Sequence, residues 1–190
     1  MTTESEYRVR LEEILRSDPW SMDVLRTVRS LQLQDWAIGA GFVRALVWDR
    51  LSGKDRTRLE DVDVLYFDPT DLSKKREKEL DQELSGLRAK VPWSAKNQAR
   101  MHLRNHTAAS RSIEDAMKSW LETPTAVAVH LDWDDRITVL APYGLHDLFQ
   151  MVIRPTPAAH ERMQQFEERL AKKPWLNIWP NIKVVRSAIR

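Results

Sequence analysis

In the first third of the chain, apolar residues recur every three or four positions, as they do on one face of an α-helix. This pattern predicts one helix that ends at Asp18-Pro19 and a second that begins near Ser21. The apolar residues 36–38 then predict a short buried strand, and Gly39-Ala40-Gly41 separates this strand from a third helix. These elements form a strand, a tight turn and a helix in that order.

Charged and apolar stretches alternate through the rest of the chain. The mostly charged residues 54–60 indicate an exposed loop, and Val62 with the apolar residues 64–67 predicts a strand that Asp68-Pro69 ends. Leucines at helical spacing in the charged stretch 72–90 predict an amphipathic helix packed on a sheet. Further elements are expected at residues 93–98 (strand), 112–121 (helix), 126–131 and 136–140 (paired strands) and 157–170 (helix). We therefore predict an α+β fold in which a mixed β-sheet is flanked by α-helices.

The length and composition of the chain narrow the class of protein. Its 190 residues fit one domain, and we expect an N-terminal helical extension at residues 1–35 packed on a main domain at residues 36–190. A net charge of +2 and 42% hydrophobic residues describe a globular chain and exclude an acidic tail or a polybasic arm. The sequence contains no cysteine, which excludes disulfides, thiolate catalysis and cysteine-based metal sites.

The sequence contains no signal for a membrane or for export. No apolar run reaches the roughly 18 residues that a membrane-spanning helix needs. The residues from Met1 to Glu6 are polar and acidic, unlike a secretory signal peptide. We therefore expect a cytoplasmic protein with no membrane partner.

The sharpest chemical signal is the pair of carboxylates in Asp61-Val62-Asp63. Side chains on a strand alternate between its faces, so Asp61 and Asp63 point the same way while Val62 is buried. Two carboxylates this close repel each other unless protons or a cation lie between them, and oxygen ligands of this kind suit Mg²⁺ or Mn²⁺. The alternative is a solvated pair at a strand end, and the tripeptide alone leaves both interpretations open.

The turn before the third helix supplies a second signal. Glycines at Gly39 and Gly41 would let a ligand approach the backbone and leave the first N–H groups of the helix available to a phosphate. Arg44, on the first helical turn, would add a charged contact. A Gly-x-Gly turn alone is usually only a tight connection, but together with the aspartate pair it describes a site for a nucleoside triphosphate and its metal ion.

These residues resemble a known signature. The segment Ile38-Gly39-Ala40-Gly41-Phe42-Val43-Arg44, followed by Asp61-Val62-Asp63-Val64, is similar to the glycine-helix and aspartate-pair signature of polymerase-beta-type nucleotidyltransferases. Within that superfamily it most resembles the head domain of CCA-adding tRNA nucleotidyltransferases, whose pattern is Gly-Gly-x-Val-Arg-Asp and then Asp-x-Asp. Residues 36–180 also resemble bacterial nucleotidyltransferase-like proteins of uncharacterised substrate. That closer likeness is carried by Gly41-Phe42-Val43-Arg44, by Asp61-Val62-Asp63-Val64-Leu65-Tyr66-Phe67-Asp68, by Trp93 with Lys96-Asn97-Gln98-Ala99-Arg100-Met101-His102, and by Leu140-Ala141-Pro142-Tyr143-Gly144-Leu145.

The resemblance implies a mechanism and roles for particular residues. Gly39, Gly41 and Arg44 would bind the triphosphate, while Asp61 and Asp63 would hold Mg²⁺ or Mn²⁺ and act as the catalytic carboxylates. A hydroxyl would attack the α-phosphate in line, so that a nucleoside monophosphate is transferred and pyrophosphate is released. The resemblance does not identify the acceptor, which could be RNA, a protein or a small molecule.

The chain departs from the CCA-adding pattern in ways that support an alternative function. Ala40 and Ala45 stand where the pattern has a glycine and a carboxylate, and the spacing from Gly41 to Asp61 is longer. Many relatives use a further carboxylate on a later strand, for which Asp132 is the candidate here. The alternative is a catalytically weak or inactive nucleotide- or RNA-binding module of the same fold. The chain is also too short for the neck, body and tail regions of CCA-adding enzymes, so we do not expect it to build CCA alone.

Further polar and aromatic residues allow two interpretations. Lys96, Asn97 and Arg100 either contact a nucleotide or cap and stabilise the fold through buried hydrogen bonds. His102 and His106 have helical spacing, but their surroundings indicate a loop, so a transition-metal site there is not expected. Tryptophans among apolar residues belong to the core, whereas the segment with Trp175 and Trp179 lies either on the core or at a weak nucleic-acid surface. These alternatives depend on tertiary structure.

Overall fold

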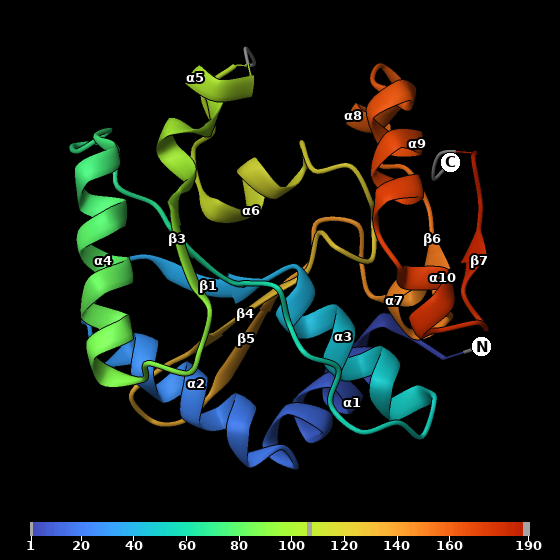
Figure 1. Ribbon diagram of the computed structural model, residues 1–190, viewed down its shortest axis with the longest axis horizontal. Coiled ribbons are helices and arrows are strands. Elements are labelled where there is room, and N and C mark those ends of the chain that lie inside the picture. The colour runs from blue at the N-terminus through green and yellow to red at the C-terminus, as the bar shows by residue number, and fades with distance from the viewer. Residues whose placement is uncertain (1, 106–107, 188–190) are drawn as a thin grey trace.

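The computed structural model describes residues 2–105 and 108–187, and a five-stranded sheet forms its centre (Figure 1). The strands are β1 (Trp36–Gly39), β2 (Val62–Tyr66), β3 (Trp93–Asn97), β4 (Ala128–Leu131) and β5 (Ile137–Leu140). Their order across the sheet is β3-β2-β1-β4-β5. Strands β2 and β3 pair in parallel, and the other neighbours pair antiparallel. The predicted α+β fold with a mixed sheet is confirmed.

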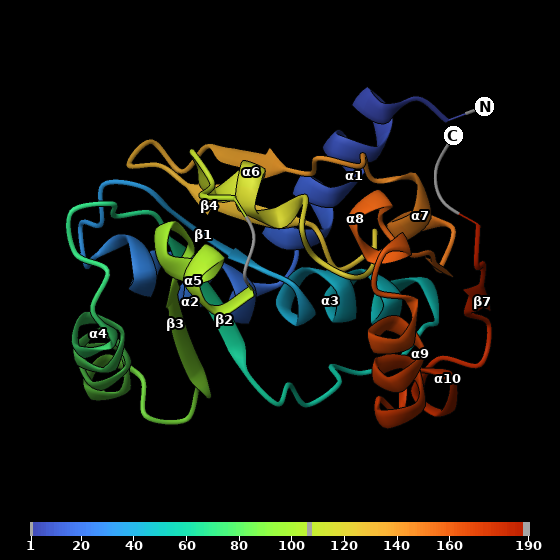
Figure 2. The same ribbon diagram turned by 90° about the horizontal axis from the view of Figure 1, so that it is seen from above.

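Helices surround this sheet. The longer ones are α1 (Glu4–Arg16), α2 (Pro19–Arg29), α3 (Gly41–Leu51), α4 (Lys74–Leu87) and α9 (Met163–Lys172). The short ones are η1 (Gln98–Arg100), α5 (Met101–Asn105), α6 (Ile113–Met117), α7 (His146–Phe149), α8 (Pro157–His160) and α10 (Trp175–Ile178). A separate parallel pair joins β6 (Val152–Ile153) and β7 (Lys183–Val184). In Figures 1 and 2, α3 lies between the sheet and the group formed by α8, α9 and α10.

Local sequence signals account for the first two helices. Thr3 and Glu6 form a capping box at the start of α1, which satisfies backbone N–H groups that have no partner within the helix. Asp18 accepts a hydrogen bond from the backbone N–H of Ser21, and Pro19 occupies the first turn of α2. Asp18-Pro19 therefore ends the first helix as predicted, but α2 begins at Pro19 rather than near Ser21.

The two faces of the sheet pack against different helices. Alternate residues such as Ile38, Val64 and Val129 join the large core that also contains buried side chains of α1, α2, α3 and α4. Ala37 and Leu65 point to the other face, where they pack against side chains of α6. Because α6 is short, it covers only part of that face. The uncovered part lies beside Asp63, which shares this face with Leu65.

Two predicted helices are shorter or broken in the structure. The helix expected at 112–121 is α6 alone, because Thr123 donates a backbone hydrogen bond to the Arg154 carbonyl and Thr156 donates one to Leu121. The helix expected at 157–170 is divided into α8 and α9 at Arg162, whose guanidinium donates to the carbonyl of Ser119. Tertiary hydrogen bonds replaced helical ones at both places.

Helices α1 and α2 share one hydrophobic core with the sheet, through side chains that include Leu11 and Leu25. The proposed division into an extension at residues 1–35 and a domain at residues 36–190 stays a prediction. Within the described part of the chain, none of the helices has the length and apolar character needed to cross a membrane. The cytoplasmic location also stays a prediction.

Candidate functional site

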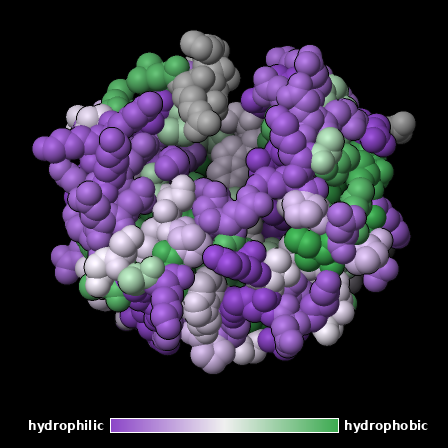
Figure 3. Space-filling view, viewed as in Figure 1, coloured by the Kyte–Doolittle hydropathy of each residue, from purple (hydrophilic) through white to green (hydrophobic). Residues whose placement is uncertain are grey.

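A cavity of about 540 Å³ lies against the partly covered face of the sheet. Its walls come from the β1–α3 turn, the loop at residues 57–61, strands β2 and β3, the region after α6, and the segment from α9 to α10. Figure 3 shows a hollow in the face seen in Figure 1, bounded by hydrophilic surface on the side of α8 and α9. Segments far apart in the sequence therefore meet around one space.

Asp61 and Asp63 both line this cavity, as the strand pattern predicts. Asp61 is exposed at the start of β2, whereas Asp63 is partly buried. Burial, and then the charge of Asp61, raise the pKa of Asp63 to about 6 from the ordinary 3.8. The ionised pair is therefore unfavourable in the unliganded protein, and a cation between the two groups would relieve the repulsion.

The chemistry of this pair fits a divalent ion that prefers oxygen ligands. Carboxylate oxygens suit Mg²⁺ and Mn²⁺, which also keep water or substrate oxygens as ligands. Among the described residues, no group of three or more His, Cys, Asp or Glu side chains is arranged to hold a metal. Asp61 and Asp63 can therefore supply only part of a coordination shell, and a ligand in the cavity would have to supply the rest.

The β1–α3 turn places its two glycines in different roles. Gly41 is the first residue of α3 and lines the cavity, and a Cβ added there would lie 3.9 Å from Arg44 Nη2, an ordinary van der Waals distance. Gly39 does not line the cavity. A Cβ at Gly39 would lie 2.9 Å from the Ala128 Cβ and 3.0 Å from the Val127 carbonyl oxygen, so β1 and β4 require glycine here to pack. The structure thus brings Gly41, but not Gly39, to the site.

Ala40, between the two glycines, has an unusual backbone. Its φ of 54° and ψ of −121° lie in a region that favours glycine. Its N–H donates a hydrogen bond to the Val127 carbonyl, and its own carbonyl accepts from Arg44 in the first turn of α3. The chain therefore keeps a glycine-like turn at the position where the CCA-adding pattern has a glycine.

Arg44 projects from the first turn of α3 into the cavity wall. Its Nη1 donates to Thr125 Oγ1 at 2.6 Å, and its guanidinium lies 4.4 Å from the ring centroid of Trp175 and 5.4 Å from that of Trp48. Its buried Nε has no hydrogen-bond partner. Burial lowers the pKa of Arg44 to about 10, against the opposing charge of Glu122. The group is therefore a buried cation at neutral pH with hydrogen-bonding capacity unused.

The segment from α9 to α10 forms a wall that the sequence analysis did not identify. Arg169 Nε lies 2.7 Å from the buried carboxylate of Glu122, and Lys173 forms an ion pair with Glu60 of the facing loop. All four residues line the cavity. Arg162, Arg169 and Lys173 recur at helical spacing in the sequence, but the acidic partners come from distant segments and could not be paired with them from sequence.

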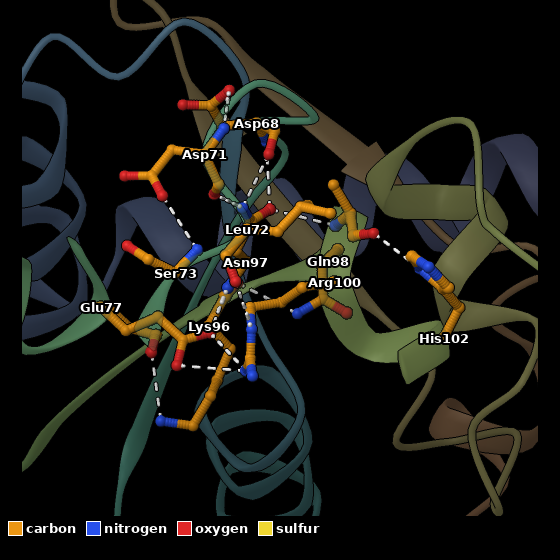
Figure 4. Close-up of polar contacts among 12 residues, drawn as sticks. Asp68, Asp71, Leu72, Ser73, Glu77, Lys96, Asn97, Gln98, Arg100 and His102 are labelled. Carbon is orange, nitrogen blue, oxygen red and sulfur yellow. Dashed lines mark hydrogen bonds and ion pairs between the residues drawn. The ribbon is translucent and has the colours of Figure 1, made fainter. Parts of the chain in front are cut away.

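The polar cluster after β3 divides between the cavity and a structural network. Lys96 lines the cavity beside Asp63, but Asn97 and Arg100 do not. In Figure 4, the Asn97 side chain lies between the β3 end and the loop with Asp68 and Asp71, and its Nδ2 donates to both of their carbonyl oxygens at 2.7 and 2.8 Å.

Asn97 and Arg100 therefore support the fold. The Asn97 Oδ1 accepts from two backbone N–H groups, so this buried amide uses its full hydrogen-bonding capacity. Arg100 donates to the carbonyl of Leu72 and pairs with Glu77. These contacts favour the structural interpretation of Asn97 and Arg100, because their polar groups are paired away from the cavity.

The candidate third carboxylate also lies elsewhere. Asp132 is in the β4–β5 hairpin and accepts hydrogen bonds from the backbone N–H groups of Asp134 and Arg136, so its side chain stabilises the turn. Trp175 and Trp179 are buried, which places their rings in the core rather than on an exposed nucleic-acid surface. His102 bonds to a backbone carbonyl through Nδ1, and His106 lies outside the described residues.

Comparison with known proteins agrees with this geometry. A family described as nucleotidyltransferase matches residues 26–184. A solved structure described as a CCA-adding enzyme head domain is 33% identical, covers 98% of both chains and superposes with a TM-score of 0.85. Among curated proteins, no sequence matches the chain.

More distant structures share the fold. A CCA-adding enzyme in complex with CTP is 13% identical over 93% of this chain, with a TM-score of 0.59. A Thermotoga maritima CCA-adding enzyme in complex with tRNA is 15% identical over 93% of this chain, with a TM-score of 0.53. The chain spans 43% and 42% of the length of these two proteins.

Proposed function

Because the chain belongs to the nucleotidyltransferase family matched by residues 26–184, we propose that it transfers a nucleoside monophosphate from a nucleoside triphosphate to an acceptor hydroxyl, with Mg²⁺ or Mn²⁺ as cofactor. The observation that carries this proposal is the meeting of Asp61 and Asp63 with the N-terminus of α3 at one cavity. The acceptor is RNA, a protein side chain or a small molecule, and the protein acts in the cytoplasm.

In this proposal the residues that line the cavity have different chemical roles. Asp61 and Asp63 hold the divalent ion, which supplies charge neutralisation and lowers the pKa of a bound hydroxyl. The N-terminus of α3 directs backbone N–H groups and the positive end of the helix dipole towards the triphosphate, and Gly41 keeps the approach open. Arg44 adds a buried positive charge beside them. Lys96 contributes a further cation from β3.

The reaction follows from this placement. The acceptor oxygen forms a bond to the α-phosphorus, and the bond from that phosphorus to the bridging oxygen breaks. Pyrophosphate leaves with the electron pair, and the hydroxyl proton passes to solvent. The chain's own contribution is to position the phosphates and to offset their charge, which is the main source of catalysis in phosphoryl transfer.

Calorimetric titration tests the site. Each nucleoside triphosphate is titrated with Mg²⁺ into the wild type and into the double variant Asp61→Asn/Asp63→Asn. The control is Asp55→Asn/Asp134→Asn, which removes two exposed charges outside the cavity. We expect binding by the wild type and the control but none by the aspartate variant. If the wild type binds none of the four nucleoside triphosphates, the proposal is overturned.

A second function is favoured by one observation. Lys96, rather than a carboxylate, stands on β3 beside the aspartate strand, and Asp132 lies in a hairpin turn away from the cavity. This arrangement favours a nucleotide- or RNA-binding module that has lost efficient transfer. Pyrophosphate release distinguishes the two functions: a transferase releases it from a bound triphosphate in the presence of candidate acceptors, and a binding module does not.

A further inference from the structure

The cavity carries more positive than negative side chains. Six cationic residues line it, against four acidic ones: Arg44, Arg58, Lys96, Arg162, Arg169 and Lys173 against Glu60, Asp61, Asp63 and Glu122. A divalent ion on Asp61 and Asp63 would neutralise that pair and leave the cations in larger excess. The charge of the site therefore favours a ligand with several negative charges.

Much of this positive charge lies along one face of α9 and its capping residues. Arg162, Gln165, Arg169 and Lys173 all line the cavity, and their spacings of three and four residues place them in one row along the helix. Arg162 donates to the carbonyls of Ser119 and Ala158 and has no carboxylate partner among the ion pairs of the described residues. The row presents donors over about three helical turns.

The row is continuous with the N-terminus of α3. Trp175 contacts two guanidinium groups: that of Arg44 lies 4.4 Å and that of Arg169 lies 5.5 Å from its ring centroid. Arg44 Nη2 lies 3.9 Å from the position a Cβ would take on Gly41, so the same column of charge reaches the start of α3. A chain of phosphates on the α3 N-terminus would extend along this column.

The two guanidiniums are poorly satisfied without a ligand. Arg44 has a buried Nε with no hydrogen-bond partner. Arg169 Nε and Glu122 Oε1 are 2.7 Å apart, yet the two atoms are not aligned as a hydrogen bond, and neither has another partner. Unpaired buried donors are costly, and the charge of Arg169 disfavours the charged form of Arg44, which the charge of Glu122 favours. A phosphate bound in the cavity would screen this repulsion.

We propose that Arg169, within the α9 row, binds the terminal phosphates of the nucleotide together with Arg44. This inference rests on the proposed function. It specifies that the α9 row binds the terminal phosphates of the substrate. When the α-phosphorus bond to the bridging oxygen breaks, the electron pair and the new negative charge go to the pyrophosphate. Arg169 is then in position to stabilise the leaving group and to hold it until release.

The test compares two variants that each neutralise an ion pair involving α9. Glu122→Gln/Arg169→Gln removes the pair in the cavity. Glu167→Gln/Arg186→Gln removes the exposed pair between Glu167 and Arg186, 2.6 Å apart and away from the cavity, and is the matched control. Binding of the Mg²⁺ complexes of nucleoside tri-, di- and monophosphates and of inorganic tripolyphosphate is measured by calorimetry. Arg169→Lys, which keeps the charge but loses the planar fork, is measured in parallel.

We expect the cavity variant to bind triphosphate and tripolyphosphate roughly tenfold more weakly or worse, while its monophosphate affinity changes less than about twofold. The control should bind all four ligands like the wild type, and Arg169→Lys should fall between them for the triphosphate. Equal loss for mono- and triphosphates, or no loss in either Arg169 variant, would overturn the inference. If the wild type binds triphosphate through Asp61 and Asp63 but Arg169 has no effect, this inference alone fails; if the wild type binds none, the proposed function fails as well.

Discussion

The ionised carboxylate of Asp63 destabilises the metal-free protein, so its removal should make that protein more stable. Its pKa is about 6 in the folded chain, against an ordinary 3.8, because the group is partly buried beside Asp61. At pH 7 this difference corresponds to about 3 kcal/mol. Solvent screening of the partly exposed side chain reduces the expected gain to about 2 kcal/mol. For a chain of this length, Asp63→Asn should raise Tm by about 4 to 8 °C.

The pH dependence tests the cause of that gain. Below about pH 3.8 both the folded and the unfolded chain carry the proton, so the variant has no advantage. Between about pH 3.8 and 6 the unfolded chain loses its proton first, and the wild type therefore loses stability relative to the variant as pH rises. Above that range the difference is constant.

The assay is thermal unfolding followed by circular dichroism at several pH values in a chelator, with Asp134→Asn as the exposed control. With excess Mg²⁺ the order should reverse, because the ion stabilises the wild type through two carboxylates and the variant through one. A variant that is no more stable than the wild type at pH 7, or a gain that is the same at pH 3.5, would refute the reasoning.

Three further predictions concern backbone and packing. Gly39→Ala should destabilise the fold by about 2 to 4 kcal/mol because its Cβ would meet Ala128 at 2.9 Å, whereas Gly41→Ala should keep wild-type stability in chemical denaturation and weaken triphosphate binding in calorimetry. Ala40→Gly should stabilise the chain by about 1 kcal/mol, since it relieves a φ of 54°, and an unchanged denaturation midpoint would contradict this. Asn97→Ala should cost about 3 kcal/mol in urea unfolding because it leaves buried backbone groups unpaired, and a loss below about 1 kcal/mol would show that water replaces the amide.

Residues close together in sequence allowed a large part of the site to be predicted. Strand alternation placed Asp61 and Asp63 on one face, and the order of strand, turn and helix placed Gly41 and Arg44 at the start of α3. These relations depend on the geometry of a single element or of one tight turn. For the same reason the five central strands were found near their observed positions.

Residues whose role depends on partners from other elements were predicted less well. The sequence is equally compatible with a ligand and with a buried network at Asn97 and Arg100, and only the folded loop after β2 supplies the Asp68 and Leu72 carbonyls that they bind. Gly39 looked like a phosphate-binding glycine, but the close approach of β4 explains it. The sequence shows which hydrogen bonds and charges a polar side chain can offer. Whether it binds a ligand or stabilises the fold depends on which groups the fold places next to it.

The helical and strand periods, the α+β class, the aspartate pair and the glycine turn could all be predicted from the sequence, because each of these follows from interactions over a few residues. Folding of the whole chain was needed to bring α9 to the cavity that Asp63 lines, to place the guanidiniums of Arg44 and Arg169 against Trp175, and to set the Glu122 carboxylate 2.7 Å from Arg169 Nε. Arg44 is distant in the sequence from Trp175, and Glu122 is distant from Arg169, so packing of the whole chain, rather than local conformational preference, selects these contacts.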